Sequence, residues 1–275
     1  MRAQVDLGPR VPGSAAHRDL ADALCEAMGR YADRLIVQEF PLDFLGRRVV
    51  CRNLIGEFRL EDGGSAERPP LLLATHFDTR AVADREPDET RRGKPIPGAN
   101  DGGSGTAVLL SLLETLGART AGRDVVVAFV DAEDVGHIEG HEFSTGAEYL
   151  AGHPPEGFAP WGEVVALDMI GGRDMVLDID AHSMSHKASR GLTAEVFRLG
   201  HDLGYPPFLR DKRGRCKYIV SDHFPFLRRG VPSCLLIDID YPQWHTQADL
   251  PEAMSEESLS VSRGVLSAFL ARRRG

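Results

Sequence analysis

Residues 125–136 read VVVAFVDAEDVG, an apolar run followed directly by acidic residues. The run from Val125 to Val130 suits a buried strand and is far shorter than the roughly 18 residues of a membrane-spanning helix. Glu133 and Asp134 come just after it. Ligands of open α/β sheets gather at the carboxyl ends of the strands, so these acids are expected to face a binding site.

Apolar strands and amphipathic helices alternate on both sides of this stretch. We predict strands over 71–76, 124–131, 163–168 and 233–238, with helices over 14–30, 105–116, 188–203 and 256–272. The alternation favours a mostly parallel sheet covered on both faces. No linker is long or polar enough to divide the chain. We therefore expect residues 1–275 to form a single α/β domain, a three-layer α/β/α sandwich with a mixed, mostly parallel central sheet.

Smaller elements are predicted around this core. Segments 34–40 and 47–59 are expected to form a hairpin that turns near Leu45 and Gly46. Ser14 is expected to cap the first long helix, since its side chain can accept a bond from a free backbone N–H. The remaining predictions are a surface turn at 62–65, an edge strand at 175–179 and a short helix at 222–229.

Charge and cysteine content exclude several classes of protein. The chain carries 32 basic against 41 acidic residues, a net charge of −9 that argues against nucleic acid as the main partner. No apolar run is long enough for a membrane helix, and the start MRAQVDLGPRVPGS lacks a signal core, so we expect a cytoplasmic protein. The four cysteines form no CxxC pair, which predicts reduced thiols. Any bound metal must then be held by oxygen and imidazole nitrogen.

Residues of that kind recur where strands end: His76, Asp78, Asp101, Glu133, Asp134, Asp168 and His245. One such aspartate usually caps a turn or a helix, and one such histidine usually lies at the surface or in the core. Several of them at successive strand ends are much harder to explain in that way. Carboxylate oxygen and imidazole nitrogen together suit zinc or a similar divalent ion.

The motifs at these positions are distinctive and cover most of the chain. They are GPRVPGS (8–14), ATHFDT (74–79), PGANDGGSGTAVLL (97–110), VVVAFVDAEDVG (125–136), ALDMIGG (166–172), SDHFPFLRRGVPSCLLI (221–237) and WHTQADLPE (244–252). In this order and spacing they resemble the superfamily of zinc-dependent aminopeptidases and glutaminyl-peptide cyclotransferases.

The resemblance implies a role for each matching residue. It implies that Asp101, Asp134 and His245 bind zinc and that Glu133 is the general acid/base. In the aminopeptidases a second zinc is also bound, with Asp101 as the bridging ligand.

The two branches use the remaining positions differently. In the aminopeptidases, residues at the positions of His76 and Asp168 complete the second zinc site. In the cyclases, the residues matching Asp168 and Asp222 form a hydrogen-bonded carboxyl cluster with the catalytic glutamate, so both are candidate catalytic residues. Asp78 would orient His76. One departure is clear: Asp134 stands where both branches usually have glutamate, and its carboxylate reaches one methylene less far.

Three features favour the cyclase branch. Trp244 precedes the ligand histidine and is expected to wall the substrate pocket, DHFPFLRRGVP is nearly the cyclase segment, and the stretch from 135 to 144 is long. The NDGGSG loop and the presence of His76 favour the aminopeptidases instead. HIEGH at 137–141 resembles a metalloprotease motif, but its glutamate does not follow the first histidine directly, so we expect an active-site loop without a metal.

These features predict a metalloenzyme that acts on a small peptide or amino-acid-derived substrate with a free α-amine. We favour a zinc-dependent glutaminyl-peptide cyclotransferase-like reaction, in which that amine attacks a zinc-polarised amide carbonyl within the same molecule. The alternative is a co-catalytic aminopeptidase with two zinc ions that hydrolyses an N-terminal peptide or amide bond. A further alternative is amide or acyl chemistry on an amino-acid-derived metabolite.

Overall fold

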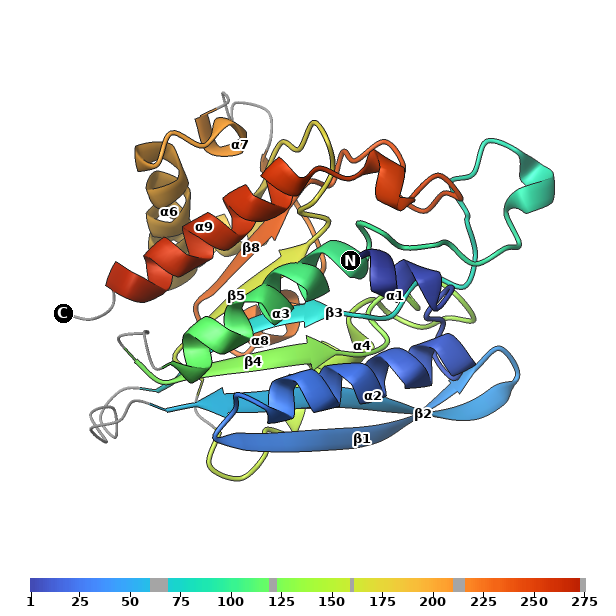
Figure 1. Ribbon diagram of the computed structural model, residues 1–275, viewed down its shortest axis with the longest axis horizontal. Coiled ribbons are helices and arrows are strands. Elements are labelled where there is room, and N and C mark those ends of the chain that lie inside the picture. Colours follow the sequence, from blue (N-terminus) through green and yellow to red (C-terminus); the bar gives the residue numbers. More distant parts are fainter. Residues whose placement is uncertain (60–68, 119–122, 159–160, 210–215, 273–275) are drawn as a thin grey trace.

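A computed structural model describes residues 1–59, 69–118, 123–158, 161–209 and 216–272 (Figure 1). The strands are β1 (Arg34–Phe44), β2 (Arg47–Phe58), β3 (Leu71–His76), β4 (Val125–Val130), β5 (Glu163–Asp168), β6 (Ile179–Asp180), β7 (Cys216–Lys217) and β8 (Ser233–Ile237). The α-helices are α1 (Arg2–Asp6), α2 (Ala15–Gly29), α3 (Gly103–Gly117), α4 (Thr145–Gly152), α5 (Ala181–Ser185), α6 (Lys187–Asp202), α7 (Pro206–Leu209), α8 (Phe224–Leu227) and α9 (Glu256–Arg272). Two 3₁₀ turns are η1 (Glu89–Arg91) and η2 (Pro251–Ala253).

Six of the strands form one mixed sheet in the order β1-β2-β4-β3-β5-β8. Strands β4, β3, β5 and β8 are parallel to one another, whereas β2 is antiparallel to both β1 and β4. The carboxyl ends of the parallel strands therefore meet at one edge of the sheet. This confirms the predicted α/β class with a mixed, mostly parallel central sheet.

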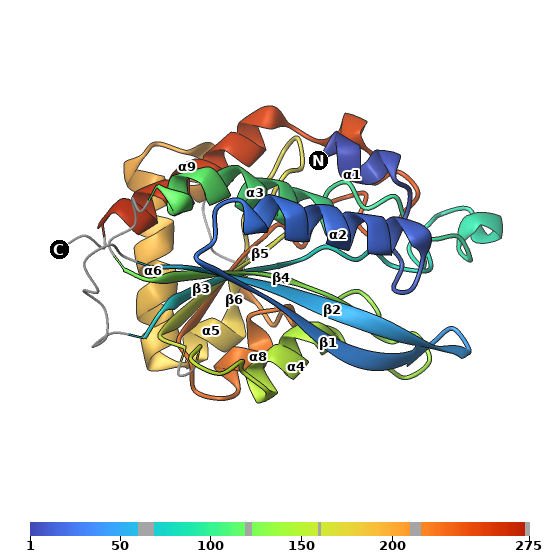
Figure 2. The same cartoon turned by 60° about the horizontal axis from the view of Figure 1, so that its bottom comes forward.

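Helices cover both faces of the sheet (Figure 2). On one face α2, α3 and α9 pack over Leu71, Leu73 and the neighbouring strand residues that point the same way. On the other face α4 and α8 pack over Leu72, Ala74 and their neighbours. Successive residues of a strand point to opposite faces, so strands that are apolar throughout must be buried on both sides.

Local sequence accounts for the ends of several elements. The Ser14 side chain accepts a bond from the His17 N–H and caps α2, as predicted. The β1–β2 hairpin turns at Leu45 and Gly46, which have φ of 52° and 70°, also as predicted. All four cysteines are free. Within the described residues, no helix has the length and apolar character that crossing a membrane requires.

One smaller prediction was wrong, one was confirmed with shorter bounds, and one lies outside the described residues. The edge strand predicted at 175–179 is absent, and the strand assigned there is Ile179–Asp180, paired with β7 in a separate two-stranded sheet. The Val176 N–H donates to the Asp238 carboxylate instead of to a neighbouring strand. The short helix predicted at 222–229 covers only Phe224–Leu227. The turn predicted at 62–65 lies outside the described residues.

Candidate active site

The polar residues that end the parallel strands converge at one edge of the sheet. His76 is the last residue of β3, Asp168 is the last residue of β5, and Glu133 and Asp134 follow β4. Together with Asp101 and His245, three of them (His76, Asp134 and Asp168) supply two groups of three buried side chains that share Asp101. Within each group the potential ligand atoms lie within 4.8 Å of one another. We call His76, Asp101 and Asp168 the inner triad, and Asp101, Asp134 and His245 the outer triad.

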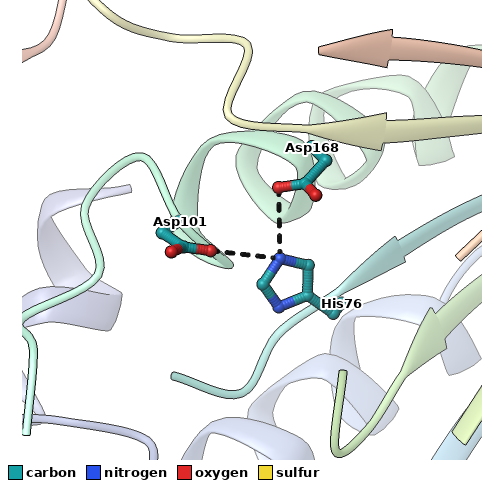
Figure 3. A group of neighbouring side chains, drawn as sticks. All are labelled: His76, Asp101 and Asp168. Atoms are coloured by element: carbon teal, nitrogen blue, oxygen red, sulfur yellow. Dashed lines mark hydrogen bonds and ion pairs between the residues drawn. The ribbon is translucent and has the colours of Figure 1, made fainter. Parts of the chain in front are cut away.

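The inner triad is arranged around one imidazole nitrogen (Figure 3). His76 Nε2 lies 3.4 Å from an oxygen of Asp101 and 3.4 Å from an oxygen of Asp168. The second oxygen of Asp168 accepts a hydrogen bond of 3.0 Å from Ser221 Oγ. Two carboxylates thus face one imidazole nitrogen, an arrangement that can hold a divalent cation.

In the outer triad, His245 Nε2 lies 3.2 Å from Asp134 Oδ1 and 3.8 Å from Asp101 Oδ2. The Oδ2 atoms of Asp101 and Asp134 are buried and have no hydrogen-bond partner among the described residues. Buried carboxylate oxygens are costly unless a donor or a cation satisfies them. Oxygen and imidazole ligands at this spacing fit zinc, so both triads are suitable zinc sites.

Asp101 belongs to both triads, and its loop is shaped to place it there. Gly102 has φ of 78°, and a Cβ atom at this position would lie 2.2 Å from the backbone oxygen of Asp78. Only glycine fits so close an approach at positive φ. The Asp249 carboxylate accepts hydrogen bonds from the N–H groups of Asn100 and Asp101. The loop therefore holds Asp101 rigidly from both sides.

Asp78 holds the turn that carries the paired acids. Its oxygens accept hydrogen bonds of 3.0 and 3.1 Å from the backbone N–H groups of Glu133 and Asp134. One of them lies 3.5 Å from His76 Nδ1, which is long for a hydrogen bond. The main contacts of Asp78 are therefore with the backbone of the turn that carries Glu133 and Asp134. The resemblance had implied instead that Asp78 orients His76.

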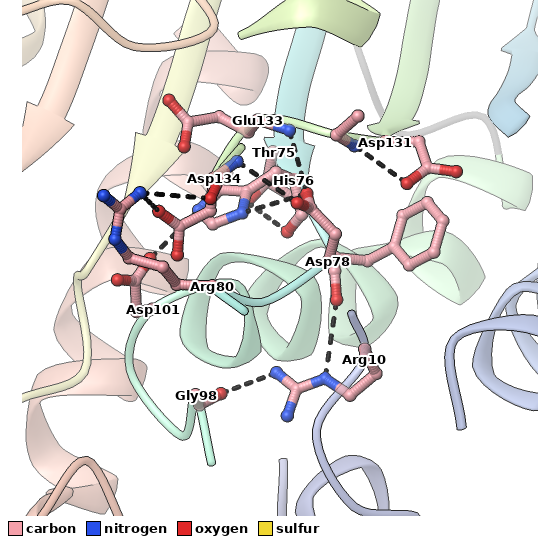
Figure 4. Close-up of polar contacts among 12 residues, drawn as sticks. Arg10, Thr75, His76, Asp78, Arg80, Gly98, Asp101, Asp131, Glu133 and Asp134 are labelled. Atoms are coloured by element: carbon pink, nitrogen blue, oxygen red, sulfur yellow. Dashed lines mark hydrogen bonds and ion pairs between the residues drawn. The ribbon is translucent and has the colours of Figure 1, made fainter. Parts of the chain in front are cut away.

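Side chains that the sequence analysis did not identify contact the ligands of the outer triad, beginning with Arg80 (Figure 4). Buried Arg80 donates to Asp134 Oδ1 at 3.2 Å and to the carbonyl of Gly136 at 3.0 Å, and it pairs with Asp84 at 2.7 Å. Asp84 in turn lies 2.9 Å from His245 Nδ1. A carboxylate in this position fixes the orientation of a ligating histidine. The position of Arg80 directly after the HFDT motif is the one feature of the sequence that could have indicated its place near the site.

Burial and, to a smaller extent, the neighbouring negative charges raise the pKa values of two carboxylates at the site. Burial, with a contribution from neighbouring Asp222 and Asp168, raises the pKa of Glu133 well above its ordinary value. Burial likewise raises the pKa of Asp222 to about 8. Such carboxylates coexist more easily when a cation lies between them, because a bound metal ion stabilises the charged form.

Asp222 is placed beside this cluster but is not bonded into it. It is 1% exposed, and neither of its oxygens has a hydrogen-bond partner among the described residues. Glu133 Oε1 instead accepts a hydrogen bond of 3.0 Å from Ser144 Oγ. The carboxyl cluster expected for the cyclase branch is therefore present as a group of neighbouring charges, without a hydrogen bond from Asp222 to Glu133.

A cavity of about 340 Å³ opens onto the site. Glu133 and all three residues of the outer triad line it, whereas His76 of the inner triad does not. Much of the remaining wall is apolar, and Trp244 forms part of it, as the sequence predicted. His137 of the HIEGH segment also lines the cavity, while His141 instead contacts the carbonyl of Asp43 at 2.8 Å. This separation agrees with a loop in which the two histidines do not share a metal.

Comparison with known proteins places the chain among relatives of two activities. A stretch of 116 residues is 30% identical to a glutaminyl-peptide cyclotransferase of Boiga irregularis, and it covers 38% of this chain and 30% of the relative. The match therefore spans less than a third of that relative's length.

Two solved structures are similar over almost the whole chain. A Tannerella forsythia glutaminyl cyclase has a TM-score of 0.87 and 28% identity, with 98% of this chain and 94% of that chain covered. A Zn-dependent exopeptidase from Parabacteroides distasonis has a TM-score of 0.88, with the same identity and coverage. These neighbours confirm the superfamily that the motifs predicted.

A family model described as peptidase family M28 matches residues 53–270. That range contains both triads, Glu133 and the walls of the cavity. Because the match extends over most of the chain, we conclude that the protein belongs to peptidase family M28.

Proposed function

We propose that the protein is a zinc-dependent enzyme with a glutaminyl-peptide cyclotransferase-like activity. The observation that carries the proposal is that Glu133, the outer triad and Trp244 all line one cavity. A proton-transfer group, a metal site and a flat apolar wall are thus available to a single bound substrate. The similarity to the Tannerella forsythia glutaminyl cyclase supports the same assignment.

We assign zinc binding to Asp101, Asp134 and His245. Zinc bound there would polarise the substrate's amide carbonyl and stabilise the negative charge that develops on its oxygen. Arg80 and Asp84 keep two of the ligands in place, which limits the motion of the site during the reaction. The side chain of Asp134 is one methylene shorter than the usual glutamate, and a hydrogen bond from Arg80 holds its carboxylate in position.

Glu133 moves the proton in this scheme. The substrate's α-amine attacks the side-chain amide carbon, a ring C–N bond forms, and the bond from that carbon to the amide nitrogen breaks. Glu133 accepts the proton that the amine loses and delivers it to the leaving nitrogen, which departs as ammonia. Its hydrogen bond from Ser144 Oγ orients the carboxylate for both transfers.

We assign supporting roles to Asp168 and Asp222. Burial raises the pKa of Asp222, so this carboxyl group takes up a proton more readily than an exposed aspartate does. A neutral Asp222 limits the negative charge next to Glu133 and can donate a hydrogen bond. Asp168, held by Ser221, completes the polar floor of the cavity.

A second candidate function is supported by the inner triad. Because its ligand atoms also lie within 4.8 Å of one another, a second zinc could be held between His76 and Asp168. The chain would then be a co-catalytic aminopeptidase, in which Glu133 takes a proton from water that attacks the first peptide bond. The similarity to a Zn-dependent exopeptidase fits this alternative. Amide or acyl chemistry on an amino-acid-derived metabolite is the third candidate.

Glutaminyl and leucyl peptides offered side by side would separate these candidates. The cyclase proposal predicts ammonia and a pyroglutamyl product from the glutaminyl peptide, and no cleavage of the leucyl peptide. Release of an intact N-terminal amino acid would overturn it in favour of the aminopeptidase. If neither peptide reacts with the zinc-loaded protein, the metabolite alternative replaces both.

A further inference from the structure

The active-site cavity has a neighbour on the other side of Trp244. This second cavity of about 280 Å³ is lined by Arg85, Ile239, Asp240, Tyr241, Pro242, Trp244 and Thr246. Ile239 and Trp244 line both cavities, so the two meet at these side chains. A substrate whose first residue occupies the active-site cavity could extend its next residue into the second one.

The two cavities differ in charge. Acidic side chains and two histidines supply the charge of the active-site cavity, and no lysine or arginine lines it within the described residues. The second cavity contains the Arg85 guanidinium, which lies 4.0 Å from the ring centroid of Trp244. Arg85 is exposed and has no carboxylate partner in the described part of the chain, whereas Asp240 is paired with Lys217 at 2.5 Å.

The backbone beneath Arg85 is held firmly against the segment that carries Trp244 and His245. Asp84 lies 2.9 Å from His245 Nδ1, the Arg85 N–H donates to the His245 carbonyl at 3.2 Å, and Glu86 accepts from the Gln247 N–H at 2.8 Å. Three consecutive residues thus attach to the loop 245–247. Arg85 is therefore a pre-positioned cation and not the end of a loose surface loop.

We propose that Arg85 is a specificity-determining residue that binds a carboxylate on the second residue of the substrate. This proposal rests on the proposed function, because it takes the first residue to occupy the cavity lined by Glu133. The carboxylate is either the C-terminus of a dipeptide or the side chain of an acidic second residue. A guanidinium stacked on an aromatic ring keeps its N–H edge free to bind a planar carboxylate.

The test compares peptides that differ only in this charge. Gln-Ala, Gln-Ala amide and Gln-Glu amide, with the corresponding leucyl peptides, are assayed for turnover and for affinity by calorimetry with the zinc-loaded protein. We expect KM to be about 2- to 5-fold lower for the carboxylate-bearing peptides, with little change in kcat, in line with an exposed ion pair. Gln-Ala against Gln-Glu amide shows which carboxylate Arg85 prefers.

Arg85→Met should abolish the preference, and Arg85→Lys should retain part of it. Arg30→Met, which removes an exposed guanidinium directly after α2, is the matched control and should leave the preference intact. If Arg85→Met leaves the carboxylate preference unchanged, or if Arg30→Met removes it equally, the inference is wrong. If the wild-type protein turns over none of the peptides, the proposed function fails, and the calorimetric affinities alone decide the role of Arg85.

Discussion

The two triads share Asp101 but differ in what surrounds them. In the outer triad, a buried arginine contacts Asp134 and a carboxylate contacts the outer nitrogen of His245. In the inner triad, a hydroxyl contacts Asp168, and the outer nitrogen of His76 lies 3.5 Å from the nearest carboxylate oxygen. All three outer ligands line the cavity, whereas His76 is buried behind it.

Under the proposed function, we take this difference to distinguish a catalytic metal site at the outer triad from an accessory one at the inner triad. A metal ion acts on substrate only where an open coordination position faces the cavity, and partners behind the ligands set how tightly it is held. All three ligands of the outer triad line the cavity, and two of them, Asp134 and His245, have such partners. We therefore expect one zinc to be required at the outer triad, and the occupancy of the inner triad to decide between the two candidate activities.

The largest effect is expected from removing one histidine from each triad. His245→Asn should lose the catalytic zinc and with it all measurable turnover. His76→Asn should keep zinc at the outer triad and retain cyclase turnover. Zinc per chain by elemental analysis, with turnover of a glutaminyl peptide, checks both variants. Equal loss of zinc and turnover in the two variants would contradict the proposed asymmetry.

Glu133→Gln should lower the rate of the reaction without changing zinc binding at either triad. Because Glu133 is not a member of either group, zinc content should match the wild type, while turnover falls by about 10²- to 10⁴-fold through loss of the proton-transfer group. Glu114→Gln, at an exposed position of α3, is the control and should be neutral. Unchanged turnover in Glu133→Gln would refute the role assigned to this residue.

The residues that hydrogen-bond to the ligands of each triad can be tested by one substitution for each triad. Asp84→Ala removes the partner of His245 and should weaken zinc binding at the outer triad by about 10- to 100-fold. Ser221→Ala removes the hydrogen bond to Asp168 and should affect only a zinc bound at the inner triad. Competition with a chelator of known affinity measures both. An identical effect of the two substitutions would show that the triads are not independently supported.

The smallest expected effect concerns the buried pair of His17 and Asp131, which links α2 to the residue that follows β4 and contacts no member of either triad. His17 Nε2 lies 2.8 Å from Asp131 Oδ1, and both side chains are fully buried. Burial alone lowers the pKa of His17, but the charge and hydrogen bond of Asp131 outweigh it and raise the pKa overall. The protonated pair therefore stabilises the fold fully below pH about 6.5, and this contribution is lost as pH rises through the raised pKa.

His17→Gln should accordingly lower the free energy of unfolding by about 2–3 kcal/mol near pH 6. The difference from the wild type should shrink towards pH 9. Chemical denaturation at both pH values measures it. A difference that stays constant or grows with pH would contradict a charged pair.

The strands and helices that could be predicted are those recognisable from the pattern of apolar and polar residues within their own segment. Short runs of apolar residues such as Val125–Val130 favour buried strands, and polar residues directly after a strand lie at the edge of the sheet. The segment at 175–179 was misread because Met175 and Leu177 alternate as in a strand. Both are buried in the core, but the backbone between them bonds to the Asp238 carboxylate instead of to a strand.

Supporting residues were harder to predict than the candidate ligands. Arg80, Asp84 and Asp249 contact the site across large separations in the chain. Arg80 follows the HFDT motif and Asp249 lies in the WHTQADLPE motif, but neither motif indicates which group the side chain contacts. The relation of Asp78 to the acid turn depends on how two strand ends pack side by side. Contacts of this kind follow from the tertiary arrangement and not from spacing along the chain.

Metal analysis of the purified protein tests the central claim most directly. We expect at least one zinc per chain, loss of peptide turnover when a chelator removes it, and recovery when zinc is added back. A protein without bound divalent metal, whose turnover is indifferent to the chelator, would contradict the account.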